Sequence, residues 1–223
     1  FDTSNNKMIY VLTDVTKKDS VKAMVDKAIS TFGQIDILVN NAGINIPRLL
    51  VDPNEAYSKY ELDETVFDKI INVNLKGVFF CAQEVARQMI KQGSGVIINI
   101  SSESGLEGSE GQSIYAASKN AINSFTRSWA KELGKLGIRV VGVAPGILEE
   151  TGLRTVEYET ALAYTRGIKV EELRAGYNKT TTTPLGRPGK LSEVADLVCY
   201  LGSNRASYIH GVTYNIAGGK TRG

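Results

Sequence analysis

The feature that most constrains this chain is the alternation of short, continuous apolar runs with longer segments of helical periodicity. The runs Gly95–Ile100 (GVIINI) and Ile138–Val143 (IRVVGV) are apolar at nearly every position, which is typical of parallel strands covered on both faces. Between them, Ser113–Leu136 carries apolar residues at helical spacing and ends at Gly137. The alternation predicts an α/β fold: a doubly wound, Rossmann-type parallel sheet with helices on both faces.

The same alternation continues along the rest of the chain. We expect further strands at Lys7–Thr13, Ile35–Val39 and Gly211–Ile216, and further helices at Ser20–Phe32, Glu64–Gln92 and Ser192–Leu201. A polar stretch, 148–190, interrupts the pattern. Because 223 residues without a repeat or linker suit one domain, residues 1–223 are predicted to form a single unit.

One part of such a sheet has no counterpart at the start of the chain. In the doubly wound order 3-2-1-4-5-6, the strand Ile35–Val39 would lie beside a first strand, and no glycine-rich turn of the dinucleotide-binding type occurs near Phe1. We therefore expect that an N-terminal βαβ portion of roughly 40 residues is missing from this sequence. The alternative is a shorter fold, which would leave apolar strands at an exposed edge.

Composition excludes several classes of protein. With 42% hydrophobic and 22% charged residues the chain should fold, and a net charge of +2 implies neither a nucleic-acid nor a membrane-surface partner. No apolar run approaches the ~20 residues of a membrane span, no signal peptide is visible, and the cytoplasm is the expected location. Cys81 and Cys199 lie in no ligand or redox pattern and are expected to be buried. His210, the only histidine, is expected at the surface and suits no metal site.

A tyrosine and a lysine form the strongest local signal. Tyr115 and Lys119 are one turn apart on one face of a predicted helix, and Ser102 lies thirteen residues before Tyr115, just past a strand. A tyrosine with a pKa of about 10 is a poor base, but a nearby ammonium favours the phenolate. The pair could therefore donate and accept a proton. An ordinary solvated helix face is the alternative.

Unusual motifs also follow other predicted strands. Asn40-Asn41-Ala42-Gly43 stands at the end of one strand and Ala144-Pro145-Gly146 at the end of another. Ligands of doubly wound sheets bind at the carboxyl ends of the strands, so these motifs should converge with Ser102 in one crevice. Asn74 is a polar residue within an apolar helical run, and its amide needs a partner there.

Together, Asn-Asn-Ala-Gly, Val-Asn-Leu, Ser-Ser…Tyr-x-x-x-Lys and Pro-Gly, in this order and spacing, resemble the short-chain dehydrogenase/reductase family over the whole chain. The resemblance implies an oxidoreductase that moves hydride between a nicotinamide cofactor and a carbinol or carbonyl carbon. It implies NAD as the cofactor, with NADP as the alternative. It also implies a homotetramer that packs through the helices Glu64–Gln92 and Ser113–Leu136.

The resemblance gives four residues catalytic roles. Tyr115 would be the general acid and base on the substrate oxygen, and Ser102 would hydrogen-bond that oxygen. Lys119 would bind the nicotinamide ribose and hold down the pKa of Tyr115. Asn74 would anchor a water that links Lys119 to proton exchange with solvent.

The resemblance also implies a set of cofactor-binding residues beyond Tyr115 and Lys119. These are Asp14, Val15, Asn41, Ala42, Gly43, Pro145, Gly146 and Ile147. Asp14 would meet the adenine amino group, although it could instead cap the helix that follows. Asn41 would line the cofactor cleft, although it could instead be a turn residue that ties neighbouring strands.

Charged residues near the predicted crevice bear on the substrate. Residues 148–190 stand where such enzymes carry a substrate lid, and Arg48, Glu103 and Arg154 are expected substrate residues beside Ser102 and Tyr115. Carboxylates would suit a polyol, and arginine or lysine would suit a phosphate. The resemblance goes further than the charges and implies a sugar phosphate as the substrate, bound at Arg48, Arg154 or the tail residues Lys220 and Arg222. Another polyol and a 3-oxoacyl thioester are the alternative substrates, and ordinary solvated loops would also explain the charges.

Overall fold

A computed structural model describes residues 8–221 of the chain. Four strands form one parallel sheet in the order β1 (Ile37–Asn40), β2 (Gly95–Ile100), β3 (Ile138–Pro145) and β4 (Thr213–Ile216). The register between β2 and β3 runs from Gly95 opposite Ile138 to Ile100 opposite Val143. The parallel α/β sheet predicted from the apolar runs is therefore confirmed.

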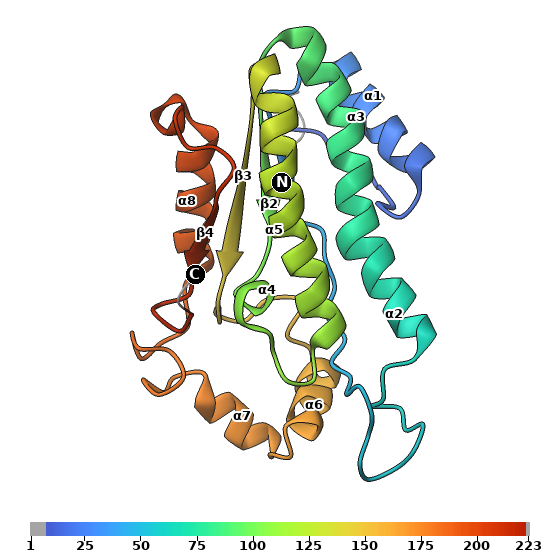
Figure 1. The fold of residues 1–223 in the computed structure, drawn as a ribbon, viewed down its shortest axis with the longest axis vertical. Coiled ribbons are helices and arrows are strands. Elements are labelled where there is room, and N and C mark those ends of the chain that lie inside the picture. The colour runs from blue at the N-terminus through green and yellow to red at the C-terminus, as the bar shows by residue number, and fades with distance from the viewer. Residues whose placement is uncertain (1–7, 222–223) are drawn as a thin grey trace.

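Helices cover both faces of this sheet (Figure 1). The helices α3 (Gly77–Gln92) and α5 (Ser113–Leu133) pack on one face, and α8 (Leu191–Gly202) packs on the other. The helix α1 (Lys18–Phe32) packs against α3, farther from the sheet. Gly33 ends α1 with a φ of 84°, a left-handed conformation that glycine adopts without strain, as its place in the sequence predicts.

The helical segment predicted over 64–92 is continuous but not uniform. It consists of α2 (Glu64–Ile71), a π-helical turn (Asn72–Lys76) and α3. The carboxylate of Asp63 caps α2 by accepting the backbone N–H of Val66. The π turn contains Asn74, and such turns inside helices are frequent at functional sites.

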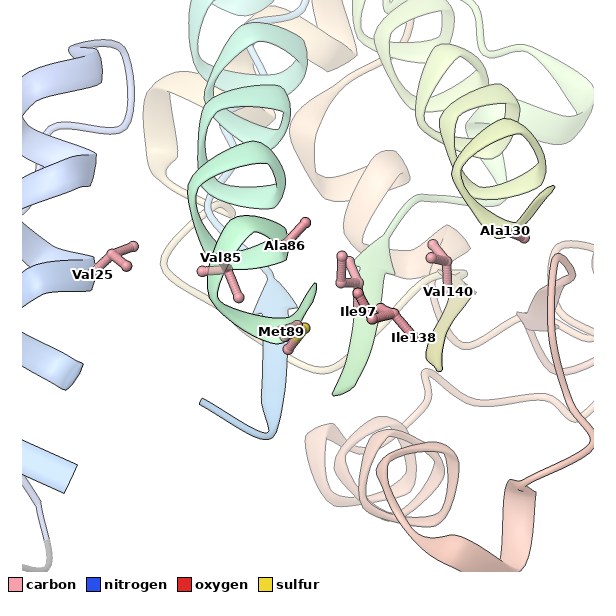
Figure 2. Packing of buried hydrophobic residues seen from close by; sticks show 8 residues of the cluster. All are labelled: Val25, Val85, Ala86, Met89, Ile97, Ala130, Ile138 and Val140. Atoms are coloured by element: carbon pink, nitrogen blue, oxygen red, sulfur yellow. The ribbon is translucent and has the colours of Figure 1, made fainter. Parts of the chain in front are cut away.

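Neighbouring residues of each central strand point into two different cores. Figure 2 shows the first core, in which Ile97 and Val140 of the sheet meet the inner faces of α3 and α5. Its buried members are Val25, Val85, Ala86, Met89, Ile97, Ala130, Ile138 and Val140. On the opposite face, Ile98 and Val141 pack with Leu201 of α8. Burial of both faces explains why these strands are apolar at nearly every position.

One expectation about the chain's elements is wrong. Residues 8–13 form no strand, and Tyr10 and Leu12 are 82% and 85% exposed, because no described segment lies beside them to complete a ladder. Lys7 lies outside the described residues. The polar stretch 148–190, in which no element was predicted, contains α6 (Val156–Thr165) and α7 (Val170–Gly176), which share a small core of Leu162, Ala163 and Leu173.

Two single-residue expectations are also wrong. His210, expected as a surface residue, is half-buried and bonded on both ring nitrogens: its Nδ1 accepts the N–H of Val140 at 3.0 Å, and its Nε2 lies 2.8 Å from the carbonyl oxygen of Ala130. The ring thus joins β3 to α5. Cys81 is buried, but Cys199 is exposed on the outer side of α8.

No helix among residues 8–221 is both long enough and apolar enough to cross a membrane.

Candidate active site

The carboxyl ends of the strands meet at one edge of the sheet, the lower edge in Figure 1. The short helix α4 (Ser104–Glu107) and the helices α6 and α7 gather at this edge. Ser102 follows β2, and Tyr115 lies in the first turn of α5, where its phenol is near enough to the Ser102 hydroxyl for that group to act on the pKa of Tyr115. The structure therefore brings together two of the residues to which the sequence assigns proton chemistry.

The neighbouring serine, Ser101, has a different part. Its hydroxyl donates to the carbonyl oxygen of Lys119 at 2.9 Å, and its N–H donates to the carbonyl of Val143 at 2.7 Å. Ser101 thus fastens α5 to the sheet. Ser102, whose oxygen accepts the N–H of Ser104 at 3.2 Å, is the serine that faces Tyr115.

Burial dominates the acidity of Tyr115. It raises the pKa of the phenol to about 12, and the nearby Tyr158 and Glu103 raise it further. The hydrogen bond with Ser102 acts in the opposite direction, towards the phenolate. The lowering of this pKa that was expected from Lys119 is therefore not the net effect here, and the phenol is protonated at neutral pH.

Lys119 is a buried ammonium with spare hydrogen-bonding capacity. Burial lowers its pKa to about 8. It donates to the carbonyl oxygen of Ile100 at 2.8 Å and lies 5.7 Å from the ring centre of Tyr115. No second acceptor for its N–H groups is present among the described residues, and a Cβ built on Gly43 would lie 3.5 Å from its Nζ. Lys119 therefore has donors left for hydroxyl groups, as the ribose of a nicotinamide cofactor requires.

Asn74 is fully buried, and its side-chain amide has the hydrogen-bond partners that a polar group within an apolar helix needs. Its Oδ1 accepts the N–H of Ile44 at 2.8 Å, and its Nδ2 donates to the carbonyl of Ile44 at 2.9 Å and to the hydroxyl of Ser118 at 3.2 Å. Asn74 thus fixes the loop after β1 against α5, which sets the position of Gly43 beside Lys119.

Asn40, not Asn41, ties the neighbouring strands together. The amide of Asn40 donates to Asn99 at 2.9 Å, and that of Asn99 donates to the hydroxyl of Thr126 at 3.0 Å, so one buried chain links β1, β2 and α5. The alternative strand-tying role for Asn41 is therefore wrong. Asn41 and Ala42 are exposed at the end of β1, where they can line a cleft.

Asp14 and Val15 form a turn before α1. The carboxylate of Asp14 accepts the N–H and the hydroxyl of Thr16 at 2.9 and 2.7 Å, and these bonds lower its pKa. Asp14 does not cap α1, because the N-cap residue is Lys17. Val15 packs on the start of α3, where a Cβ on Gly77 would lie 2.8 Å from its Cγ2. The turn therefore lies close to the start of α3, which directly follows the π turn that contains Asn74.

The end of β3 is held close to β4. Gly146 donates its N–H to the carbonyl of Ile216 at 3.0 Å, and a Cβ there would come 2.7 Å from Ala217. Only glycine permits this approach. Pro145 precedes it in the strand, and Ile147 accepts the N–H of Gly189 at 2.9 Å, which joins the loop after β3 to the end of residues 148–190.

Two of the expected substrate residues are engaged with other groups. The ammonium of Lys220 lies 2.9 Å from Glu103 and 2.5 Å from Glu107, so it is not a free cation. The guanidinium of Arg154 stacks 4.2 Å from the ring centre of Tyr177 and also donates to the carbonyl of Leu148. Arg222 lies outside the described residues.

A cavity of about 500 Å³ opens between the loop after β1, α2 and α6. Its lining includes Asn45, Arg48, Lys59, Lys69 and Tyr158. Only Arg48 among these was expected at the site. Lys59, Lys69 and Tyr158 belong to none of the motifs, so the motifs gave no signal for them.

Comparison with known proteins agrees with this geometry. Residues 2–162 match the short chain dehydrogenase family. The chain is 67% identical over 211 residues to the sorbitol-6-phosphate 2-dehydrogenase of Klebsiella pneumoniae, covering 95% of this chain and 79% of that protein. It is 42% identical over 213 residues to a 3-oxoacyl-acyl-carrier-protein reductase of Thermotoga maritima, covering 94% and 75%.

A solved structure gives the same result. The crystal structure of a sorbitol-6-phosphate 2-dehydrogenase from Erwinia amylovora matches with a TM-score of 0.81 and 31% sequence identity, over 95% of this chain and 78% of that one. The chain belongs to the short-chain dehydrogenase family of oxidoreductases, which work with a nicotinamide nucleotide.

Proposed function

We propose that this enzyme interconverts sorbitol 6-phosphate and fructose 6-phosphate by hydride transfer with NAD. The observation that carries the proposal is the 67% identity, over 95% of the chain, to the dehydrogenase of Klebsiella pneumoniae that is named for this substrate. The choice of NAD rests on the family resemblance. It is tested by comparing kcat/KM for NAD and NADP.

Tyr115 and Ser102 carry the proton chemistry in this proposal. When the ketone is reduced, the phenol of Tyr115 donates a proton to the substrate oxygen, and its pKa of about 12 keeps that proton available at neutral pH. Ser102 holds the same oxygen in reach of the phenol. Bound NAD would accept the hydride of the carbinol carbon when the reaction runs as an oxidation. In that direction the phenolate of Tyr115 accepts the proton of the carbinol hydroxyl and becomes the phenol, and the ammonium of Lys119 favours the phenolate that this step requires.

The cofactor would lie along the carboxyl ends of the strands. Lys119 would meet the ribose hydroxyls with its spare N–H donors, and Asn74 would keep the loop around Gly43 in place for this contact. The other proposed cofactor residues are Asp14, Val15, Asn41, Ala42, Gly43, Tyr115, Pro145, Gly146 and Ile147.

We further propose that residues 148–190 form a substrate lid within a single catalytic domain. The lid helix α6 is attached to the loop that follows β1, since Tyr164 donates to Asp52 at 2.8 Å and stacks on Tyr60 with ring centres 3.9 Å apart. Lids beside an active site commonly exclude water during the reaction. Arg154, stacked on Tyr177, would stiffen the lid rather than contact substrate.

A homotetramer in the cytoplasm is also part of the proposal. Phe67 of α2 and Phe79 of α3 are 45% and 37% exposed, and an interface through these helices would cover them. Sedimentation equilibrium measures the assembly, and fractionation of the source cells measures the location.

A 3-oxoacyl thioester is the second candidate substrate, favoured by the 42% identity to the Thermotoga maritima reductase. Rates of nicotinamide reduction with sorbitol 6-phosphate and with sorbitol, and of oxidation with an acetoacetyl thioester, separate the candidates. The proposal expects the sugar phosphate to give the highest kcat/KM. A thioester that is turned over faster would refute it.

A further inference from the structure

We infer that Arg48, Lys59 and Lys69 form the subsite that holds the phosphate group of the substrate, with Asn45 receiving a hydroxyl of its carbon chain. This inference rests on the proposed function. All four residues line the same cavity of about 500 Å³, although they come from three parts of the chain: the loop after β1, the segment before α2, and α2 itself. It also replaces Arg154, which is not among the residues that line the cavity, and Lys220, whose ammonium is paired with Glu103.

The cavity is adjacent to the proposed proton donor. Arg48 donates its backbone N–H to the carbonyl of Gly111 at 2.7 Å. Its backbone also forms an isolated β-bridge with Gln112, the residue at the start of α5. On the opposite wall, the hydroxyl of Tyr158 accepts from the side chain of Gln112 at 2.9 Å and lies close enough to Tyr115 to raise its pKa. A substrate held at Tyr115 can therefore extend past Tyr158 into this space.

The charge of the lining selects an anion. No carboxylate of the described residues lies within salt-bridge distance of Arg48, Lys59 or Lys69, whereas the cations of Arg174 and Arg187 are paired. The single acidic residue of the lining is Glu157, and its own backbone N–H and the hydroxyl of Thr155 lower the pKa of its carboxyl. The lining thus carries three cations and one carboxylate, a positive balance that favours an anion. Arg48 donates one N–H to the carbonyl of Pro47 at 2.7 Å, and Lys59 lies 5.0 Å from the ring centre of Tyr60, but neither contact neutralises the charge. Three cations without a carboxylate partner suit the several oxygens of a phosphate.

An unpartnered acceptor adds the second part of the subsite. The side-chain oxygen of Asn45 is buried and has no hydrogen-bond partner among the described residues. Because a buried acceptor without a partner is costly, a donor from a ligand would satisfy it. A hydroxyl of a polyol supplies that donor, and the aliphatic walls at Ile44, Ile46 and Leu153 suit the C–H faces of its chain.

The test is a triple variant, Arg48→Gln with Lys59→Met and Lys69→Met, compared with a control that loses equal charge through Lys27→Met, Lys91→Met and Lys135→Met on exposed helical positions. We expect the triple variant to raise KM for sorbitol 6-phosphate by at least about tenfold, since each charged hydrogen bond is worth about that factor. The control should leave KM unchanged, and kcat/KM for unphosphorylated sorbitol should be the same in all three proteins.

Binding of inorganic phosphate, followed by ³¹P line broadening, separates this inference from the proposed function. A wild-type enzyme that binds phosphate, with binding lost in the triple variant, supports the subsite even if sorbitol 6-phosphate is not oxidised. If sorbitol 6-phosphate is oxidised but the triple variant keeps both its KM and its phosphate binding, the function stands and the subsite is overturned. Equal phosphate binding by wild type and triple variant overturns the subsite in either case.

Discussion

The ammonium of Lys220 lies 2.9 Å from the carboxylate of Glu103, the residue that directly follows Ser102 in the proposed catalytic site. Thr221 adds a hydrogen bond of 3.1 Å to the same carboxylate. Burial raises the pKa of Glu103, and Lys220 opposes that rise. The last described residues of the chain thus neutralise a buried charge beside the proton donor.

Loss of Lys220 should make stability depend on pH. A raised carboxyl pKa favours the protonated form in the folded protein, so stability falls as pH rises through the folded pKa. Lys220→Met raises that pKa further and should lower the free energy of unfolding by about 2–3 kcal/mol at about pH 8, and by much less at about pH 5. Urea denaturation at the two pH values measures this. Adding Glu103→Gln to Lys220→Met should restore most of the lost free energy of unfolding. Equal losses at both pH values would contradict the account.

Lys119 should lower the free energy of unfolding of the protein. Its pKa is lowered from 10.5 to about 8 by burial, so the folded protein disfavours the charged form, and the penalty grows as pH falls towards the folded pKa. Lys119→Met should therefore be inactive yet more stable by about 2 kcal/mol near neutral pH, after the lost bond to Ile100 is deducted. The gain should vanish by about pH 10.5. Lys131→Met, exposed on the same helix, is the matched control and should show no such trend.

Tyr115→Phe should separate chemistry from folding. Removal of the hydroxyl deletes the proton donor and should lower kcat by about 10²–10⁴-fold. The free energy of unfolding should change little, since the ring keeps its packing. Steady-state kinetics and urea denaturation of the same preparation measure both. A kcat that falls less than tenfold would remove Tyr115 from the proposed role.

His210 should matter for stability and not for catalysis. Its ring joins the N–H of Val140 to the carbonyl of Ala130, and His210→Ala leaves both backbone groups without this partner. We expect a loss of about 2–3 kcal/mol in the free energy of unfolding with an unchanged KM. Tyr208→Ala is the control, because Tyr208 is fully exposed two residues away and should cost little. Equal effects of the two substitutions would argue against the bridging role.

The sequence was sufficient where one local signal decides the structure. Burial on both faces made the run Gly95–Ile100 a strand with the predicted bounds, and Gly33 and Gly137 end helical segments as predicted, both in left-handed conformations. The grouping of Ser102 with Tyr115 also followed from sequence, because parallel strands end at a common edge.

The sequence was insufficient where distant groups decide. Whether Asn40 or Asn41 ties the strands depends on which side chain points at Asn99, and strand bounds predicted to within a residue cannot decide this. The structural role of His210 depends on backbone groups that are 70 and 80 residues away in the sequence. The helix α6 packs on α7 and on the loop after β1, so its apolar residues lie on several sides and form no single stripe of helical spacing that could have predicted the helix.

The identity of the product tests the central claim most directly. Sorbitol 6-phosphate labelled with ¹³C at C2 is incubated with the enzyme and NAD, and the product is followed by NMR while nicotinamide absorbance is recorded. The account predicts fructose 6-phosphate, with the label appearing at a ketose carbon in step with NAD reduction, and no product from Tyr115→Phe. A product oxidised at C1, or no oxidation of sorbitol 6-phosphate by the wild-type enzyme, would contradict it.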